Sequence, residues 1–185
     1  MKKIFIFILL VTFVACSDKK VVQKVTFTGE TQGTYYAITY FESKGRDLQP
    51  QIDSILRAFD QSVSLWVPSS IISRVNENDS LVKPDDWFIS LFNLSIEVSD
   101  KTGGAFDCTV GPLVNAWGFG FRNRENMNQK IVDSLLQFIG YRNIALVDGK
   151  VTKKDPRMQL DFNAIAQGYA VDVLGKYLES EGIVN

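Results

Sequence analysis

Four short stretches of this sequence combine polar, aromatic and glycine residues in ways that a packed core alone does not require. In chain order they are residues 31–34, 64–70, 102–120 and 160–172. The 185 residues contain no histidine, which excludes Ser-His-Asp and Cys-His catalysis and any histidine-ligated metal site within them. Their chemistry must therefore come from carboxylates, hydroxyls, amides, backbone groups, lysine or arginine.

The densest of these stretches is the glycine-rich run 102–120. Its glycines allow the backbone to approach a bound ligand closely, and Asp107 and Thr109 add polar atoms among apolar neighbours. Asp107 could equally serve as a structural group that caps or holds the loop. From the residues alone, both interpretations stay open.

The stretch 160–172 places Asp161 at the end of a predicted strand, just before a predicted helix. A helix N-terminus presents free N–H groups and a positive dipole, which favours a bound phosphate. An aspartate there would repel phosphate unless it holds a metal ion or binds another part of the ligand. The alternative is that Asp161 or Asn163 is a simple N-cap.

The other two stretches are less specific. Trp66 lies beside several hydroxyl residues and could stack on a flat ring ligand, although a loop that leads into a capped turn explains the same residues. Gln32 lies in a predicted hairpin turn, where Gly33 supplies the positive φ angle. Taken together, the four stretches suggest a cleft for a ring-bearing, phosphorylated ligand.

Two hairpins and one further strand are predicted around these stretches. Alternating apolar residues predict hairpins over residues 25–40 and 144–153, the second around Asp148-Gly149, which is a strong two-residue turn signal. Residues 158–162 have the pattern of another strand. Because these strands alternate with helices, we expect an α+β domain with a mostly antiparallel sheet and amphipathic helices.

Helical spacing of apolar residues predicts four helices. The first begins at Pro50 and the second at Pro84, while the third ends at Gly140 and the last and longest ends at Gly182. The apolar stripe expected for the last helix consists of Gln167, Val171, Leu174 and Leu178.

The overall charge gives no indication of a nucleic-acid partner. Lys and Arg total 20 and Asp and Glu total 21, for a net charge of −1, whereas nucleic-acid-binding domains normally carry a basic face. We therefore expect no nucleic-acid binding.

The first residues look like a bacterial lipoprotein signal. Lys2 and Lys3 precede an apolar run over 4–15 that is too short to cross a bilayer, and Cys16 follows it. We therefore expect a signal peptide over 1–15, a tether over 16–24 and the folded domain over 25–185. The protein would then be lipid-anchored through Cys16 on the periplasmic side of a membrane.

The four stretches, in this order, resemble the ApbE family of flavin transferases. The most specific match is the run Thr102-Gly103-Gly104-Ala105-Phe106-Asp107, which continues through residues 109–115 and 117–120, and the stretch 160–172 is nearly as specific. The similarity extends from Gly29 to Asn185. It implies an ApbE-like, T-fold-like α+β domain.

The resemblance also implies an activity. Enzymes of this family bind FAD and, with Mg²⁺, transfer its FMN half to a threonine hydroxyl of a target protein and release AMP; the targets include subunits of Rnf- and Nqr-type redox complexes. The positions that match FAD contacts of the family are Gln32, Trp66, Ala105, Phe106, Asp107, Asp161 and Gln167. Ala164 matches a Mg²⁺ ligand, for which it can offer only its backbone carbonyl. The catalytic group is not identified.

This sequence differs from the family pattern at several positions. Gln32 replaces a commoner Met, Gln167 replaces a commoner Lys or Glu, and Asn163-Ala164 stands where many members have Gly-Gly. Family members also continue past the point that corresponds to Asn185, with Asp and Thr ligands for Mg²⁺, so we expect these residues to be the N-terminal portion of a longer enzyme. Two alternatives stay open: an FAD pyrophosphatase that gives FMN and AMP, and a non-catalytic flavin-binding lipoprotein. In each case we expect Asp107 and Asp161 to face each other across one groove.

Overall fold

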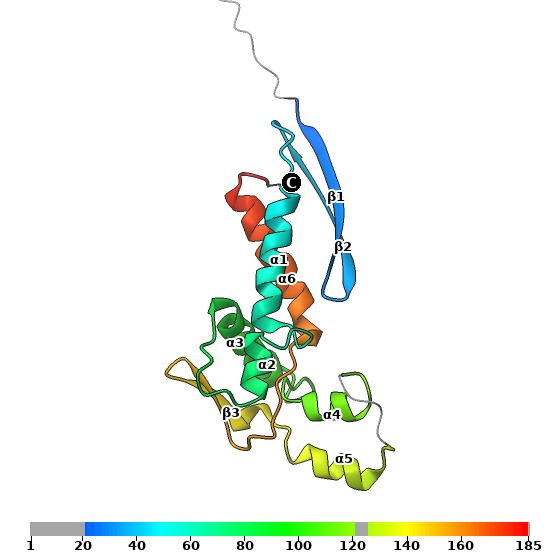
Figure 1. The fold of residues 1–185 in the computed structure, drawn as a ribbon, viewed down its shortest axis with the longest axis vertical. Coiled ribbons are helices and arrows are strands. Elements are labelled where there is room, and N and C mark those ends of the chain that lie inside the picture. Colours follow the sequence, from blue (N-terminus) through cyan, green and yellow to red (C-terminus); the bar gives the residue numbers. More distant parts are fainter. Residues whose placement is uncertain (1–20, 121–125, 185) are drawn as a thin grey trace, which may run out of the picture.

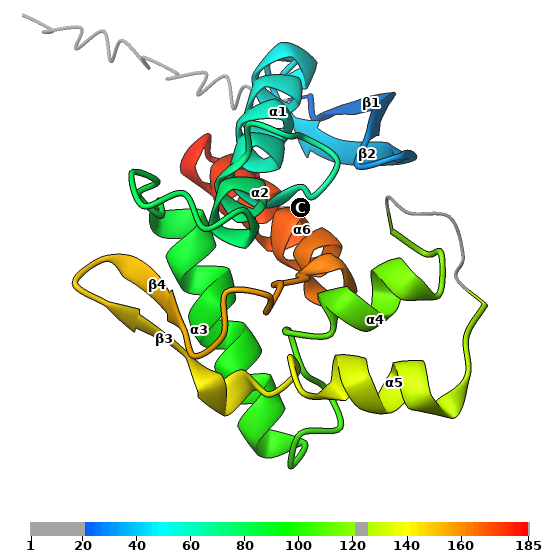
Figure 2. The same cartoon turned by 60° about the horizontal axis from the view of Figure 1, so that its bottom comes forward.

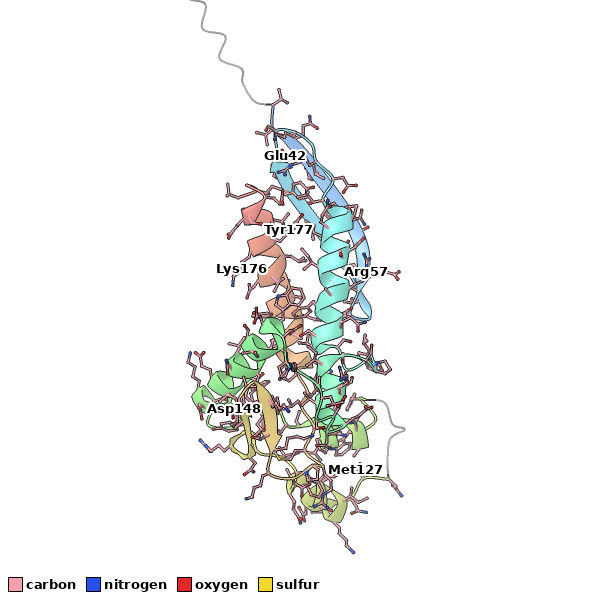
Figure 3. All side chains as sticks on the ribbon, turned by 60° about the vertical axis from the view of Figure 1, so that its left-hand side comes forward. Glu42, Arg57, Met127, Asp148, Lys176 and Tyr177 are labelled. Carbon is pink, nitrogen blue, oxygen red and sulfur yellow. The ribbon has the colours of Figure 1, made fainter. Side chains whose placement is uncertain are left out.

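The computed structural model describes residues 21–120 and 126–184. A long hairpin and the helices α1 (Gln49–Val63) and α6 (Asn163–Ser180) lie side by side at one end, and the remaining helices and a second hairpin form the other end (Figure 1). Glu42 and Tyr177 lie toward the first end, while Met127 and Asp148 lie toward the second (Figure 3). Cys16 and the signal over 1–15 lie outside the described residues, so the lipid anchor stays a prediction. Within residues 21–120 and 126–184 there is no helix with the length and apolar character needed to cross a bilayer.

The first hairpin consists of β1 (Gln23–Thr31) and β2 (Thr34–Glu42), which pair antiparallel. Its two turn residues, Gln32 and Gly33, have φ angles of 52° and 72°, as required by the type I′ turn that suits the twist of paired strands. The predicted alternation is confirmed, because Phe27 and Ile38 pack against the core while their strand neighbours face outward.

Two long helices lie beside this hairpin. Helix α1 (Gln49–Val63) begins next to Pro50, as predicted, and buries Ile52, Leu56, Phe59 and Val63. Helix α6 (Asn163–Ser180) packs against it, and the Phe59 and Tyr169 rings stack with centroids 6.1 Å apart.

The apolar stripe predicted for α6 is wrong in part. The buried residues are Ala166, Ala170 and Leu174, whereas Gln167 is exposed and Val171 is 68% exposed. The prediction placed the larger side chains of the helix on its buried face. The structure instead buries two alanines, whose small side chains allow close packing. The two faces differ by one residue, or about 100° of rotation.

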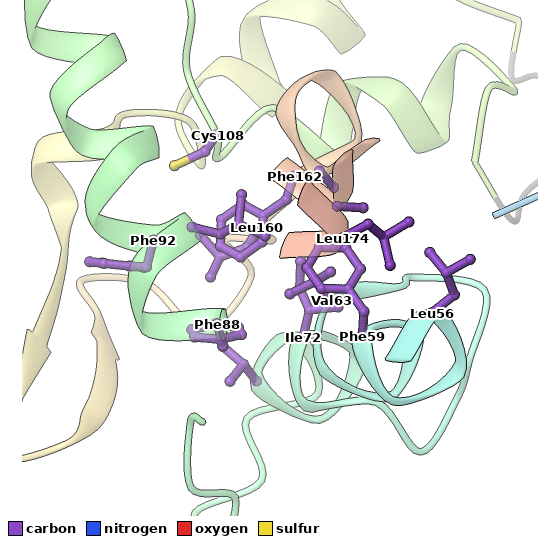
Figure 4. Packing of buried hydrophobic residues seen from close by; sticks show 14 of the residues in the cluster. Leu56, Phe59, Val63, Ile72, Phe88, Phe92, Cys108, Leu160, Phe162 and Leu174 are labelled. Atoms are coloured by element: carbon purple, nitrogen blue, oxygen red, sulfur yellow. The ribbon is translucent and has the colours of Figure 1, made fainter. Parts of the chain in front are cut away.

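The core lies where α2 (Ile71–Asn76), α3 (Asp86–Lys101) and residues 158–162 meet α1 and α6. Helix α2 is capped by Ser70, and α3 is capped by Asp85, whose side chain accepts the Phe88 amide. Phe88 and Phe162 meet edge to face with centroids 5.4 Å apart (Figure 4). Cys108 is fully buried and belongs to the same core cluster.

The far end of the molecule carries the short elements. These are α4 (Gly111–Ala116), α5 (Gln129–Leu136), the 3₁₀ turn η1 (Tyr141–Asn143), β3 (Ile144–Val147) and β4 (Lys150–Lys153). The β3–β4 hairpin has the predicted turn and register. Figure 2 shows this hairpin on one side of α3 and the α4–α5 pair on the other.

Two predictions differ from this arrangement. Helix α5 ends at Leu136, before Gly140, because the chain tightens into i→i+3 hydrogen bonds at Phe138 and Ile139. Residues 158–162 form no strand; only an isolated parallel bridge joins Gln159 to Val110. The fold is nevertheless α+β with small antiparallel sheets, and each described sheet is a separate two-stranded hairpin.

Candidate functional site

A cavity of about 420 Å³ lies where the loop before α2, helix α4 and the segment before α6 meet. Its wall includes one carboxylate and two aromatic rings of particular interest: Asp161, Trp66 and Phe119. Trp66 is 61% exposed and Phe119 is 80% exposed. The remaining lining residues are Leu65, Pro68, Ser73, Asn76, Glu77, Gly111, Val114, Asn115, Gly120, Gln159, Leu160 and Asn163.

Residues 160 and 161, which we call the floor of this cavity, are held by individual hydrogen bonds and not by a β-ladder. Asn76, the last residue of α2, donates from Nδ2 to the Leu160 carbonyl at 2.9 Å and accepts the Leu160 amide on Oδ1 at 2.7 Å. The next amide, that of Asp161, donates to the carbonyl of Cys108 at 2.8 Å. These three bonds fix Asp161 between α2 and the glycine-rich run.

Lys153 supports the same floor from below. Its Nζ donates to the carbonyls of Val75 and Met158, each at 3.0 Å. Burial lowers the pKa of this ammonium to about 8. Lys153 therefore ties β4 to the end of α2 and to the segment that leads into Asp161.

Asp161 is almost fully buried, with 7% of its surface exposed. Its Oδ1 accepts the amide of Asn163 at 2.8 Å, which is the local contact expected of a residue that prepares a helix start. Burial raises the pKa of this carboxyl, and hydrogen bonds from Asn163 offset the increase only in part. The N-cap residue of α6 is Phe162 and has no side-chain cap, so neither Asp161 nor Asn163 is the N-cap; Asp161 combines a local turn contact before the helix with a place on the cavity wall.

Glycine is required at two places on the wall. A Cβ at Gly120 would come within 1.9 Å of Asn115 Oδ1, and one at Gly111 would come within 2.9 Å of the Gln159 backbone oxygen. Asn115 itself donates to Gln159 Oε1 at 2.9 Å. Gly111 therefore allows α4 to approach the segment before Asp161, whereas Gly120 lets the chain after α4 pack closely on Asn115.

Asp107 has a different environment from the one expected. Its Oδ1 accepts the Thr109 amide at 2.8 Å and the Thr109 hydroxyl at 2.6 Å, and its Oδ2 accepts the Tyr141 amide at 2.9 Å. Thr109, fully buried, also accepts the Gly140 amide at 2.7 Å. Asp107 thus fastens the glycine-rich run to the 140–141 turn.

The groove expected between Asp107 and Asp161 is therefore not formed by their two carboxylates. The segments are adjacent through the Cys108–Asp161 backbone bond, but Asp107 lines neither this cavity nor the one described next. Ala105 is exposed, Phe106 packs against the edge of the core, and neither lines these cavities. Contact of residues 105–107 with FAD stays a prediction.

A second cavity of about 240 Å³ adjoins the first. It brings together three of the predicted site residues, Gln32 from the hairpin turn, Trp66 and Gln167 from α6. Trp66 and Asn163 line both cavities. The other lining residues are Asp60, Val63, Ser64 and Ala166.

Several wall residues were not identified from the sequence. Asp60 occurs inside a helical pattern and gives no signal of its own. Asn76, Asn115 and Phe119 belong to stretches that were already of interest, but only the fold shows that they face the same space.

The predicted metal ligand lies in the first turn of α6. The carbonyl of Ala164 belongs to the helix, where it normally accepts the amide four residues later. Residues 21–120 and 126–184 hold no cluster of three or more Asp, Glu, Cys or His side chains suited to a metal ion. Binding of Mg²⁺ at Ala164 stays a prediction.

A family model described as the ApbE family matches residues 32–185. The chain belongs to the ApbE family. The matched region contains Trp66, Asp161 and the full lining of both cavities.

Two curated relatives of this ApbE-family chain are named FAD:protein FMN transferase. The protein from Vibrio cholerae is 32% identical over 90% of this chain and 52% of its own length. The one from Escherichia coli K12 is 31% identical over 92% of this chain and 54% of its own length. This chain thus spans about half the length of the curated relatives that it matches.

Solved structures agree with this assignment. The flavin transferase ApbE from Vibrio cholerae superposes with a TM-score of 0.83 at 31% identity, over 89% of this chain and 56% of that one. The apo form of the flavinyl transferase ApbE from Pseudomonas stutzeri gives a TM-score of 0.79 at 28% identity, over 88% and 55%. The predicted ApbE-like fold is confirmed.

Proposed function

We propose that this protein takes part in the transfer of FMN from FAD to a threonine hydroxyl of another protein, with release of AMP. The single observation that carries the proposal is the cavity that Asp161 and Trp66 share in a chain whose relatives are named FAD:protein FMN transferase. The adjoining second cavity extends this space toward Gln32 and Gln167.

The walls suit a dinucleotide with two flat rings. Trp66 and Phe119 offer exposed aromatic faces on which a ring can stack. The N-terminus of α6, an 18-residue helix, offers amide groups and a positive dipole near the cavity. The buried carboxylate of Asp161 would repel a phosphate, so we expect it to accept hydrogen bonds from an uncharged part of the ligand.

The reaction is a displacement at phosphorus. The threonine oxygen bonds to the phosphorus of the FMN half, and the bond from that phosphorus to the oxygen shared with AMP breaks. AMP leaves with that oxygen, and the threonine proton passes to a base or to solvent. Such reactions depend mainly on positioning and on neutralising phosphate charge. The described residues position the nucleotide; no base among them is assigned.

We also propose that Mg²⁺ takes part, with the Ala164 carbonyl as one ligand. Mg²⁺ usually takes oxygen ligands from few protein groups together with substrate phosphates and water. Because the described residues hold no cluster of three or more Asp, Glu, Cys or His side chains suited to a metal ion, no step is assigned to the ion. Its other protein ligands would come from the part of the family's length that this chain does not span.

The proposed setting is the bacterial envelope. The lipoprotein-like sequence before Cys16 supports an anchor that holds the protein on the periplasmic side of a membrane. Acceptor proteins there would be flavin-carrying subunits of redox complexes of the Rnf or Nqr type. Metabolic labelling with a radioactive fatty acid, compared between the unaltered protein and Cys16→Ser, tests the anchor.

Transfer is tested by incubating the full-length protein with FAD, Mg²⁺ and an acceptor domain that carries the target threonine. The expected result is a covalent yellow adduct whose mass increase equals one FMN residue, together with AMP. An acceptor with Thr→Ala is the control and should stay unmodified. Free FMN and AMP formed equally with and without acceptor would instead indicate a pyrophosphatase. FAD binding without any Mg²⁺-dependent product would indicate a flavin-binding protein.

A further inference from the structure

The second cavity contains a half-buried carboxylate, that of Asp60, one oxygen of which is buried without a partner among the described residues. Asp60 lies in the last turn of α1 and lines this cavity. Its Oδ1 is buried and has no hydrogen-bond partner among the residues that the structure describes. Buried polar atoms in folded proteins are nearly always paired, so an unpaired acceptor beside a cavity calls for an explanation.

No cation of the cavity wall balances this carboxylate. Its lining contains no lysine or arginine. Burial raises the pKa of Asp60, and the nearby polar side chain of Gln32 opposes the rise without cancelling it. The unliganded protein therefore carries an unfavourable group here, a common sign of a site that is completed by a ligand.

The chemistry of the wall restricts what the ligand can present. An ionised carboxylate only accepts hydrogen bonds, whereas the amides of Gln32 and Gln167 can both donate and accept. A phosphate would be repelled by Asp60, and a purely apolar group would leave Oδ1 unpaired. The group that fits is an uncharged O–H or N–H donor.

We propose that Asp60 accepts a hydrogen bond from a hydroxyl or N–H donor of the bound flavin dinucleotide, which makes the second cavity the subsite for an uncharged part of that ligand. This inference rests on the proposed function. Both halves of FAD carry such donors, as sugar or ribityl hydroxyls and as ring N–H groups. The cavity volume of about 240 Å³ suits one part of the dinucleotide, and the shared residues Trp66 and Asn163 allow the ligand to continue into the first cavity.

The test compares FAD binding by the unaltered full chain, Asp60→Asn and Asp60→Ala, measured by flavin fluorescence. Asp60→Asn keeps the shape of the side chain but removes the charge and one acceptor. We expect a loss of FAD affinity of about 10- to 100-fold, since a lost hydrogen bond to a charged group has an effect of this size. The matched control is Glu179→Gln, because Glu179 is an exposed carboxylate on α6 that lines neither cavity and should leave binding unchanged.

A second readout separates a binding role from structural damage. Asp60→Asn should raise the melting temperature of the unliganded protein while it weakens binding, because it removes a half-buried, unbalanced charge. Competition with riboflavin and with AMP then identifies the half of FAD that Asp60 contacts. The affinity for one of the two should fall in Asp60→Asn and the affinity for the other should not.

Three results would overturn the inference. Equal FAD affinity in the unaltered protein, Asp60→Asn and Asp60→Ala would overturn it and leave the proposed function in place. Failure of the unaltered full chain to bind FAD at all would overturn both. A lower melting temperature in Asp60→Asn, with weaker binding only in proportion to unfolded protein, would assign Asp60 a structural role and also overturn it.

Discussion

Asn76 pairs with the backbone of Leu160 through two hydrogen bonds, one from Nδ2 to the carbonyl at 2.9 Å and one from the amide to Oδ1 at 2.7 Å. One side chain thus satisfies both polar groups of a buried residue that no neighbouring strand pairs. Because Asp161 follows directly, the position of this carboxylate depends on a residue 85 positions earlier, at the end of a six-residue helix.

Asn76→Ala should lower the free energy of unfolding by about 2–4 kcal/mol, because it leaves a buried donor and a buried acceptor unpaired. Chemical denaturation measures this. Asn93→Ala, at an exposed position of α3, is the control and should change stability by less than about 0.5 kcal/mol. Equal small effects of the two substitutions would contradict a positioning role for Asn76.

Asp161→Asn should make the unliganded protein more stable at neutral pH. Burial raises the pKa of Asp161 in the folded state, so the protonated form contributes stability that is complete below the unfolded pKa and is lost as pH rises through the folded pKa. The substitution keeps the acceptor for the Asn163 amide and removes this pH-dependent loss. The difference in melting temperature between the two proteins should be largest at neutral pH and shrink at acidic pH.

The same substitution should weaken FAD binding if Asp161 contacts the ligand. Greater stability combined with weaker binding is the pattern of a residue kept for function. A variant that is both less stable than the unaltered protein and unable to bind would show that the carboxylate is mainly structural.

Asp107→Ala should lower the free energy of unfolding by about 2–4 kcal/mol, because it removes three hydrogen bonds to Thr109 and Tyr141. Thermal and chemical unfolding measure the loss. FAD titration at a temperature where the variant remains folded then separates the two interpretations of Asp107. Weaker binding by the folded variant would support a ligand contact, whereas unchanged binding would leave a purely structural role.

Gly111→Ala and Gly175→Ala should have opposite effects on stability. At Gly111 the new Cβ meets the Gln159 backbone 2.9 Å away, whereas at Gly175, inside α6, it meets nothing within 4 Å. Gly111→Ala should cost about 1–3 kcal/mol, and Gly175→Ala should gain about 0.5–1 kcal/mol from the better helix former. The melting temperatures of the two variants test this prediction. A lower melting temperature for both variants would contradict it.

The local features of the fold follow from the sequence more readily than the site does. Asp148-Gly149 fixes the second hairpin and Pro50 marks the start of α1, because both act through backbone angles of a few adjacent residues. The family pattern was also visible in two dense stretches. By contrast, residues 158–162 have the composition of a strand, but Leu160 pairs with the Asn76 side chain and only an isolated bridge joins Gln159 to Val110. Composition does not show which partner is present.

The site depends on distant pairs, which a single sequence does not display. Asp107 accepts the amide of Tyr141, 34 residues away, and with this partner its carboxylate lies outside the lining of both cavities. Asp60 shares a cavity with Gln32 and Gln167 only because the hairpin turn, the end of α1 and the start of α6 meet. Each of these residues is unremarkable in its own segment.

The labelling rate of the fully buried Cys108 thiol can measure how often the segment around Asp161 opens. Its thiol, whose pKa is raised to about 12 mainly by burial, reacts with a disulfide reagent only when the segment beneath Asp161 moves away. In a Cys16→Ser background, the rate of thiol labelling would therefore report how often that segment separates from the core. Slower labelling with FAD present would show that the bound nucleotide reduces the transient separation of this segment from the core.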